Sequence, residues 1–174
     1  VFEAIVGSAR RLLNCTLATL LRTDGQTFQQ MAIEKADGSR TSSARRMRPV
    51  DPDHDFPSQV IVSKTMLHLP DWSAIALSAH EAEVFAQIGC HSSLMLPLLR
   101  AGACIGVLAL LRVEAGTFSD QEIALARSFC DHAVIAIENA RLFNETKEAL
   151  ELQTTSAEVL RVVGESMADA QPVF

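Results

Sequence analysis

The fold is decided by one stretch, residues 92–143, which reads SSLMLPLLRAGACIGVLALLRVEAGTFSDQEIALARSFCDHAVIAIENARLF. It holds two apolar runs, 93–99 and 103–113, that are joined through a turn at Gly102. Because each run is apolar at successive positions, we predict two neighbouring strands that are covered on both faces. Ser119 and Glu122 then have the spacing of a capping box, which predicts the start of a helix.

The predicted helix continues beyond this stretch, since neither Pro nor Gly occurs between Ser119 and Gly164. A helix of about 45 residues would be roughly 65 Å long at 1.5 Å per residue, which is more than a small domain needs. Up to about residue 143 the first helix and the sheet can bury its apolar stripe, and beyond that point we predict that a second copy of the chain covers it. The stripe recurs every seven residues and consists of Phe129, Ala136, Phe143, Leu150 and Ala157.

Upstream of residue 92 the sequence predicts further helices and strands. Residues 2–13 carry apolar side chains at helical spacing, and residues 15–35 have the pattern of a hairpin that turns at Asp24 and Gly25. Residues 36–57 are polar and predict a long loop. A short helix near 57–64, a short strand at 66–71 and a helix that ends at Gly89 follow. This order predicts an α+β fold with a largely antiparallel sheet.

Composition and charge limit the classes of function. The 174 residues are 48% hydrophobic, which supplies a core for one domain with an added element. The net charge of −6 argues against nucleic acid, or direct contact with an anionic membrane, as the main interaction. No apolar run approaches the ~20 residues of a membrane span. Because Val1 opens directly into a helical pattern, we expect a piece of a longer protein.

Residues 92–143 resemble the C-terminal half of a GAF domain. The resemblance rests on Pro97 at the end of a buried strand, the turn at Gly102, the strand around Gly106, the helix start at 118–120 and the sequence AIENA at 136–140. In element order it extends over residues 1–145, which we expect to form the GAF domain. The remainder, 146–174, is similar to the helical linkers between tandem GAF domains of bacterial sensor histidine kinases and cyclic-dinucleotide enzymes, so a following domain is expected.

The resemblance implies a GAF (PAS-like) fold, in which helices flank a central antiparallel sheet and a long C-terminal helix carries the signal. It also implies a ligand-sensing, non-catalytic domain of a cytoplasmic signal-transduction protein, such as a multi-GAF sensor histidine kinase, acting as a homodimer through that helix. The ligand is expected to be a small molecule that the sequence does not identify. Position in the element order alone gives five candidates for lining its pocket, namely Trp72, Phe85, Cys90, His91 and Ser93.

The adjacent pair Cys90 and His91 raises two chemical alternatives. Bilin-binding GAF domains attach the pigment to a similar pair, but here Cys90 directly precedes the strand, and the motifs that hold the pigment are not evident. GAF-fold free-methionine-sulfoxide reductases carry a catalytic cysteine in a similar segment, and Cys104 would then be the resolving thiol. The acidic residues that those enzymes place after the cysteine are missing. We therefore favour a packing role for the pair and keep the redox enzyme as an alternative.

Other ligand classes are not supported. Some GAF domains that bind cyclic GMP carry Asn-Lys in the last strand, where this chain has Leu111, Arg112 and Val113. No histidine has a partner at the spacing of a zinc or haem site, and His54, which lies among three aspartates, lacks the spacing of a calcium loop. We therefore expect no metal and no resident cofactor.

Two questions stay open in the sequence. Four arginines between 40 and 48 are either an anion site at the rim of the pocket or a solvated loop, and we favour the loop; they are Arg40, Arg45, Arg46 and Arg48. The whole domain is either a ligand sensor or a purely structural dimerisation module whose own side chains fill the pocket.

Overall fold

The computed structural model describes the backbone of residues 2–41 and 47–168, and the side chains of residues 2–39 and 47–153. The chain divides into two compact units, Val1–Ala136 and Ile137–Phe174, which are described separately below. The predicted Arg45 and Arg46 lie outside the described residues, as do the side chains of Arg40 and Ala157.

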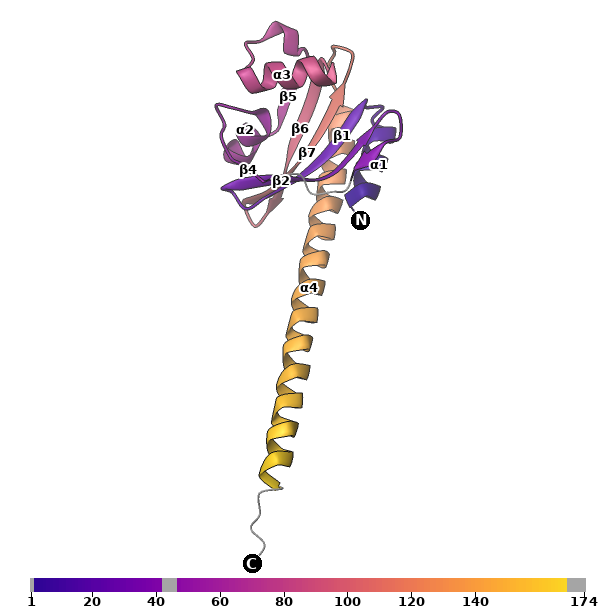
Figure 1. The fold of residues 1–174 in the computed structure, drawn as a ribbon. Coiled ribbons are helices and arrows are strands. Elements are labelled where there is room, and N and C mark those ends of the chain that lie inside the picture. The colour runs from indigo at the N-terminus through magenta and orange to yellow at the C-terminus, as the bar shows by residue number, and fades with distance from the viewer. Residues whose placement is uncertain (1, 42–46, 169–174) are drawn as a thin grey trace, which may run out of the picture. The chain divides into compact units, whose positions relative to one another are not determined.

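The first unit is built on a seven-stranded antiparallel sheet with the order β3-β2-β1-β7-β6-β5, in which β4 also pairs with β2. The predicted α+β fold with an antiparallel sheet is confirmed (Figure 1). The strands are β1 (Leu17–Thr23), β2 (Thr27–Lys35), β3 (Arg40–Thr41), β4 (Arg48–Pro49), β5 (Leu67–Leu69), β6 (Ser92–Arg100) and β7 (Ala103–Arg112).

The predicted hairpin is formed by β1 and β2. Asp24 Oδ1 accepts hydrogen bonds from the backbone N–H groups of Gln26 and Thr27, and Gly25 has a positive φ of 90°. The stretch 36–57, which the sequence predicts to be a loop, contains β3 and β4. Two-residue strands carry no alternation of apolar and polar side chains, so periodicity does not reveal them.

The helices begin and end at residues that satisfy their backbone groups. Asp55 caps α2 (Phe56–Ser63) and Ser78 caps α3 (Ala79–Ile88), each accepting from a backbone N–H three residues on. Gly89, with φ 69°, ends α3. Ser119 and Glu122 form the predicted capping box at the start of α4 (Asp120–Ala168). The remaining helices are α1 (Phe2–Leu12) and a 3₁₀ turn, η1 (Trp72–Ala74).

Both faces of the sheet are covered, as its uninterrupted apolar strands predict. Figure 1 shows α2 and α3 on one face, and α1 with the start of α4 on the other. Alternate residues of the central strands point to opposite faces of the sheet. Met95 and Ala109 belong to the core cluster on the face of α2, whereas their neighbours Leu94 and Leu110 point to the opposite face. Trp72 is 1% exposed and is the largest fully buried side chain of the described residues.

Two glycines permit close approaches in this unit. A Cβ on Gly106 of β7 would lie 2.3 Å from the backbone oxygen of Leu21 in β1, at the point where the register of β1 shifts. A Cβ on Gly7 of α1 would lie 2.5 Å from Oε2 of Glu34, a carboxylate of β2 that is only 2% exposed. Glu34 is held under α1 by Arg10, whose Nε lies 2.9 Å from its Oε1.

Arg112, at the end of β7, joins both of the helices that cover the second face. Its guanidinium donates to the backbone oxygen of Leu13, directly after α1, and to the carboxylate of Glu122 in the first turn of α4. The guanidinium also lies 3.9 Å from the ring centroid of Phe118. One side chain therefore connects the end of the first helix with the start of the last.

The second unit continues α4, which extends past Gly164 to Ala168. Its described side chains are exposed from Asn139 onward, and Phe143 and Leu150 of the predicted stripe are 70% and 62% exposed. In the first unit, the stripe residue Phe129 is half-buried. The domain boundary expected after residue 145 stays a prediction. Over the described part of the chain, no helix combines the length and the apolar character needed to cross a membrane.

Candidate functional site

A cavity of about 630 Å³ lies in the first unit, on the face of the sheet that α2, η1 and α3 cover. Its floor is formed by alternate side chains of β1, β2, β6 and β7, and therefore by one face of the sheet. These floor residues are mostly apolar and include Leu17, Leu21, Phe28, Ile33, Met95, Ala109 and Leu111. The volume is in the range of pockets that hold small organic molecules.

The opposite wall comes from β4 and from the segment between β4 and β6. Trp72, Val84 and Ile88 supply its apolar part. Its polar part is formed by Arg48, Asp55, His80 and Glu81. These four come from three separate elements, and together with the floor they give the cavity an apolar interior and one polar corner.

Short hydrogen bonds connect the side chains of the polar corner. Nη2 of Arg48 lies 2.9 Å from Oδ2 of Asp55 and 2.9 Å from Nε2 of His80. Because an arginine only donates, Nε2 of His80 accepts and its proton lies on Nδ1. Burial and the neighbouring Arg48 both lower the pKa of His80, so the ring is neutral at pH 7. Arg48 also lies over the ring of Phe28, 5.2 Å from its centroid. The guanidinium is thus already engaged on several sides.

Glu81 is the second buried carboxyl group of this corner, at 3% exposure. Its Oε1 accepts a hydrogen bond of 2.6 Å from the backbone N–H of Phe56, and it thereby ties the first turn of α3 to the start of α2. Burial raises the pKa of Glu81 to about 7, and the negative charge of Asp55 acts in the same direction. Near neutral pH the group is therefore partly protonated.

We expect Glu81→Gln to stabilise the domain by about 2 kcal/mol at pH 8 and to have little effect near pH 5. The folded state raises the pKa of this carboxyl group, so its contribution to stability is fully present below pH 4.5 and is lost as the pH rises through 7. Glutamine mimics the protonated form and can still accept from Phe56. Urea denaturation at pH 5, 6 and 8 measures the difference, and Glu83→Gln on the exposed face of α3 is the control. An equal pH dependence in wild type and Glu81→Gln would contradict the assignment.

The five candidates from the sequence lie close together, but only one of the five lines the cavity. Trp72 is that residue, and its Nε1 donates to Oγ of Ser93 at 2.9 Å. Phe85 stacks against Trp72 at 6.3 Å between centroids, and His91 packs edge-on against Phe85 at 4.9 Å. Cys90 is buried in the core beside them. Four of the five therefore form a layer that supports the Trp72 side chain, and their part in ligand binding stays a prediction.

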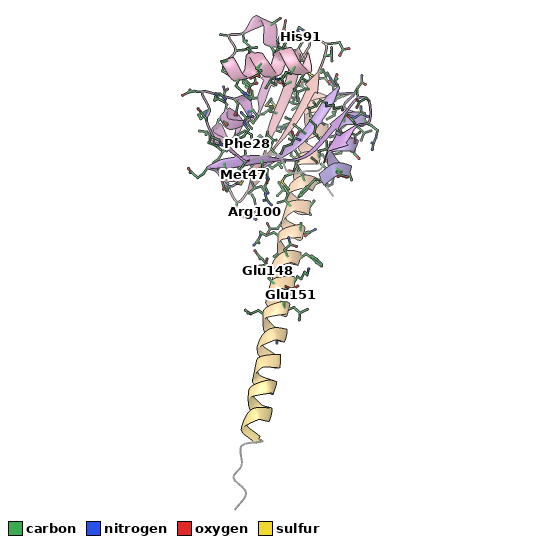
Figure 2. The ribbon with its side chains drawn as sticks, viewed as in Figure 1. Phe28, Met47, His91, Arg100, Glu148 and Glu151 are labelled. Atoms are coloured by element: carbon green, nitrogen blue, oxygen red, sulfur yellow. The ribbon has the colours of Figure 1, made fainter. Side chains whose placement is uncertain are left out.

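The side-chain view agrees with this division. Figure 2 shows His91 at the end of the sheet next to α3, well separated from Phe28, which does line the cavity. The cavity extends along the sheet from Leu111, which pairs with Ser93, to Phe28. Sequence reasoning missed Gln30, His80 and Glu81 as lining residues. The one available signal was Gln30, a polar side chain on the same face of β2 as Phe28.

The cysteines do not have the character of nucleophiles. All four are buried. Burial raises the pKa of the Cys90 thiol to about 11 and also raises that of Cys104. A protonated, buried thiol does not attack a sulfoxide, so this geometry opposes the redox alternative. Among the described residues, no cluster of His, Cys, Asp and Glu is arranged to hold a metal ion.

Comparison with known proteins identifies the fold. The sequence model of the GAF domain family matches residues 1–137. The GAF domain of PixJ from Thermosynechococcus elongatus, in its blue-light-absorbing form, aligns with a TM-score of 0.68 at 16% identity, covering 86% of this chain and 90% of that one. The GAF domain of a two-component sensor histidine kinase from Bacillus halodurans gives 0.65 at 15%, covering 83% and 98%. That of a phosphoenolpyruvate-protein phosphotransferase from Acinetobacter gives 0.66 at 14%, covering 83% and 84%. No curated protein sequence matches the chain.

Proposed function

The chain belongs to the GAF domain family, and from this premise we propose that it is the sensory domain of a signalling protein, binding a small molecule in the cavity over its sheet. The observation that carries the proposal is the cavity itself, which combines a volume of about 630 Å³ with an apolar floor and one polar corner. A purely structural module would fill this space with its own side chains. Structures with the same fold that are named as parts of a sensor kinase and of a chemotaxis protein support a signalling role.

The proposed signal leaves the cavity through a continuous set of hydrogen bonds in the first unit. The backbone N–H of Trp72 donates to the oxygen of His91, and the N–H of His91 donates to the oxygen of Arg112, each at 2.8 Å. The Arg112 side chain then contacts the end of α1 and the first turn of α4. A ligand that moves Trp72 would shift these contacts, to the extent that its affinities for the two arrangements differ.

A second connection leads from the covering segment to the start of α4. The backbone N–H of Phe118 donates to Nε2 of His68 in β5 at 3.0 Å, and the two rings pack edge to face. His68 lies four residues before Trp72, which lines the cavity. Movement of the segment therefore acts on α4 by a route that does not pass through Arg112.

We propose that α4 carries the signal onward as part of a homodimer, as expected for a cytoplasmic sensor kinase. The support for the dimer is the exposure of large apolar side chains on the second unit, in particular Phe143 and Leu150. Apolar residues at seven-residue spacing are typical of helices that pair in a coiled coil. The proposed seam contains Phe143 and Leu150, with Ala157 in the same register.

Leu150→Glu is expected to convert the dimer into a monomer, because it places a charge in the proposed seam. Leu152→Glu is a matched control, since Leu152 is equally apolar and 70% exposed but lies about 200° further around the helix. Light scattering coupled to size exclusion measures both variants. If Leu152→Glu dissociates the protein as strongly as Leu150→Glu, the seam is wrongly assigned.

Native mass spectrometry of the freshly purified protein, followed by denaturation of the same sample, tests the proposed function. We expect a dimer with additional mass that is lost on denaturation. A dimer without additional mass that no small molecule stabilises against heat would favour the structural module. A monomer would also remove the argument for the seam.

A further inference from the structure

One polar side chain that lines the cavity has an atom without a partner. Gln30 of β2 is a lining residue, and its Nε2 is the one buried side-chain nitrogen or oxygen of the described residues that makes no hydrogen bond. A buried donor without an acceptor costs free energy in the ligand-free protein. Because this nitrogen is closed to water in the ligand-free protein, the amide of Gln30 has to turn toward the cavity before a ligand acceptor can recover that cost.

The charges around the cavity do not favour an anion. Its charged lining residues are two cations, Lys35 and Arg48, and three acids, Asp37, Asp55 and Glu81. Arg48 is paired with Asp55 and also donates to His80. A phosphate or carboxylate entering the cavity would therefore meet at least as much negative as positive charge, and would exchange its hydration for an already neutralised guanidinium.

The rest of the lining is suited to an apolar body. Leu17, Leu21 and Leu111 of the floor face the cavity opposite Val84 and Ile88 of α3. Burial of apolar surface against these residues stabilises a bound apolar molecule. A strongly hydrated group gains little from the same contacts.

We propose that the cavity selects an uncharged, mainly apolar molecule whose hydrogen-bond acceptor, a carbonyl oxygen or a ring nitrogen, receives the N–H of Gln30. This inference rests on the proposed function, since it names the class of ligand for the same cavity. The apolar floor supplies most of the affinity, and the amide of Gln30 fixes the orientation of the ligand and rejects molecules that lack an acceptor at that point.

A neutral fluorescent ketone, 6-propionyl-2-(dimethylamino)naphthalene, is a suitable probe. It carries one carbonyl acceptor on an apolar body, and its emission moves to longer wavelength when the carbonyl accepts a hydrogen bond. We expect it to bind the wild-type protein with enhanced emission. Gln30→Met keeps the length of the side chain but removes the donor. The affinity should fall about tenfold, which corresponds to one neutral hydrogen bond, and the emission of the bound probe should shift to shorter wavelength.

Gln29→Met is the matched control. Gln29 is the neighbour of Gln30 in β2 but points to the other face of the strand and does not line the cavity, so its replacement should leave both affinity and emission unchanged. Naphthalene-2-carboxylate, an anion of similar size, should bind the wild-type protein at least tenfold more weakly than the ketone. Thermal melting confirms that each variant is folded, and Gln30→Leu serves as a second variant without a donor.

The outcomes separate this inference from the proposed function. If the ketone binds wild type and both Gln30 variants equally, or if the carboxylate binds more tightly than the ketone, the assignment of Gln30 is overturned while the cavity remains a ligand site. If the ketone fails to bind wild type but native mass spectrometry finds a bound molecule, the class of ligand is overturned alone. If neither finds a ligand, both proposals fail.

Discussion

Gly106→Ala is expected to lower the free energy of unfolding by about 3 kcal/mol, near the upper end for an added methyl group in a packed interior. The new Cβ would lie 2.3 Å from the backbone oxygen of Leu21 and 2.9 Å from Cδ1 of Leu98. The Leu98 side chain can move, but the Leu21 oxygen belongs to β1, which pairs with β7 along most of its length. Relief of the collision therefore requires the two central strands to separate. Urea denaturation followed by far-UV circular dichroism measures the loss.

The control for this substitution is Gly102→Ala, in the turn that precedes the same strand. Gly102 has a φ of 78°, and a Cβ at this residue would have no neighbour within 4 Å, so the substitution adds backbone strain without a collision. It should cost about 1 kcal/mol. Losses of equal size at the two positions would show that backbone conformation, and not the approach of β1, explains the glycine at 106.

Arg10→Met is the second substitution with a large expected effect, again about 3 kcal/mol. It removes the closer of two arginines from Glu34, whose carboxylate is 2% exposed beneath α1. The methionine can replace the packing of the arginine stem, so the loss reports on the buried charge that has lost its nearest cation. Chemical denaturation at pH 7 is the appropriate measurement.

Two further variants make this prediction specific. Arg11→Met should cost less than about 1 kcal/mol, because Arg11 is half exposed and its Nη1 lies 3.6 Å from the Glu34 carboxylate. The double variant Arg10→Met with Glu34→Met should recover most of the lost stability, since it removes the charge together with its partner. A double variant that is no more stable than Arg10→Met would contradict the role assigned to the pair.

The elements that follow from local pattern were predictable. The strands β6 and β7, the capping box at Ser119 and the end of α3 at Gly89 each depend on residues that are neighbours in the sequence. The confirmed antiparallel sheet follows from their order. The family resemblance of residues 92–143 adds the topology, which local pattern alone does not determine.

The candidate site was much less predictable, because it is assembled from distant segments. Arg48, His80 and Gln30 line one cavity only after the segment between β4 and β6 folds over the sheet. An acidic residue in the first turn of a helix is usually a solvated cap, so nothing in the sequence indicates that Glu81 is buried against the N–H of Phe56. Of the five candidates chosen by element order, Trp72 lines the cavity and the other four pack beside it, so their part in binding stays a prediction. Element order gives the region of a site, but not the side chains that reach it.

The burial of the four cysteines has a practical consequence for labelling. Since the native thiols are buried, and burial raises the pKa of Cys15 and Cys90 to about 11 and that of Cys130 to about 12, they should react slowly with maleimides at neutral pH. A single cysteine introduced at the exposed position 152 would then be modified selectively, without first removing the native ones. A nitroxide attached there would report the separation of the two copies of α4 by electron spin resonance, with and without a ligand in the cavity.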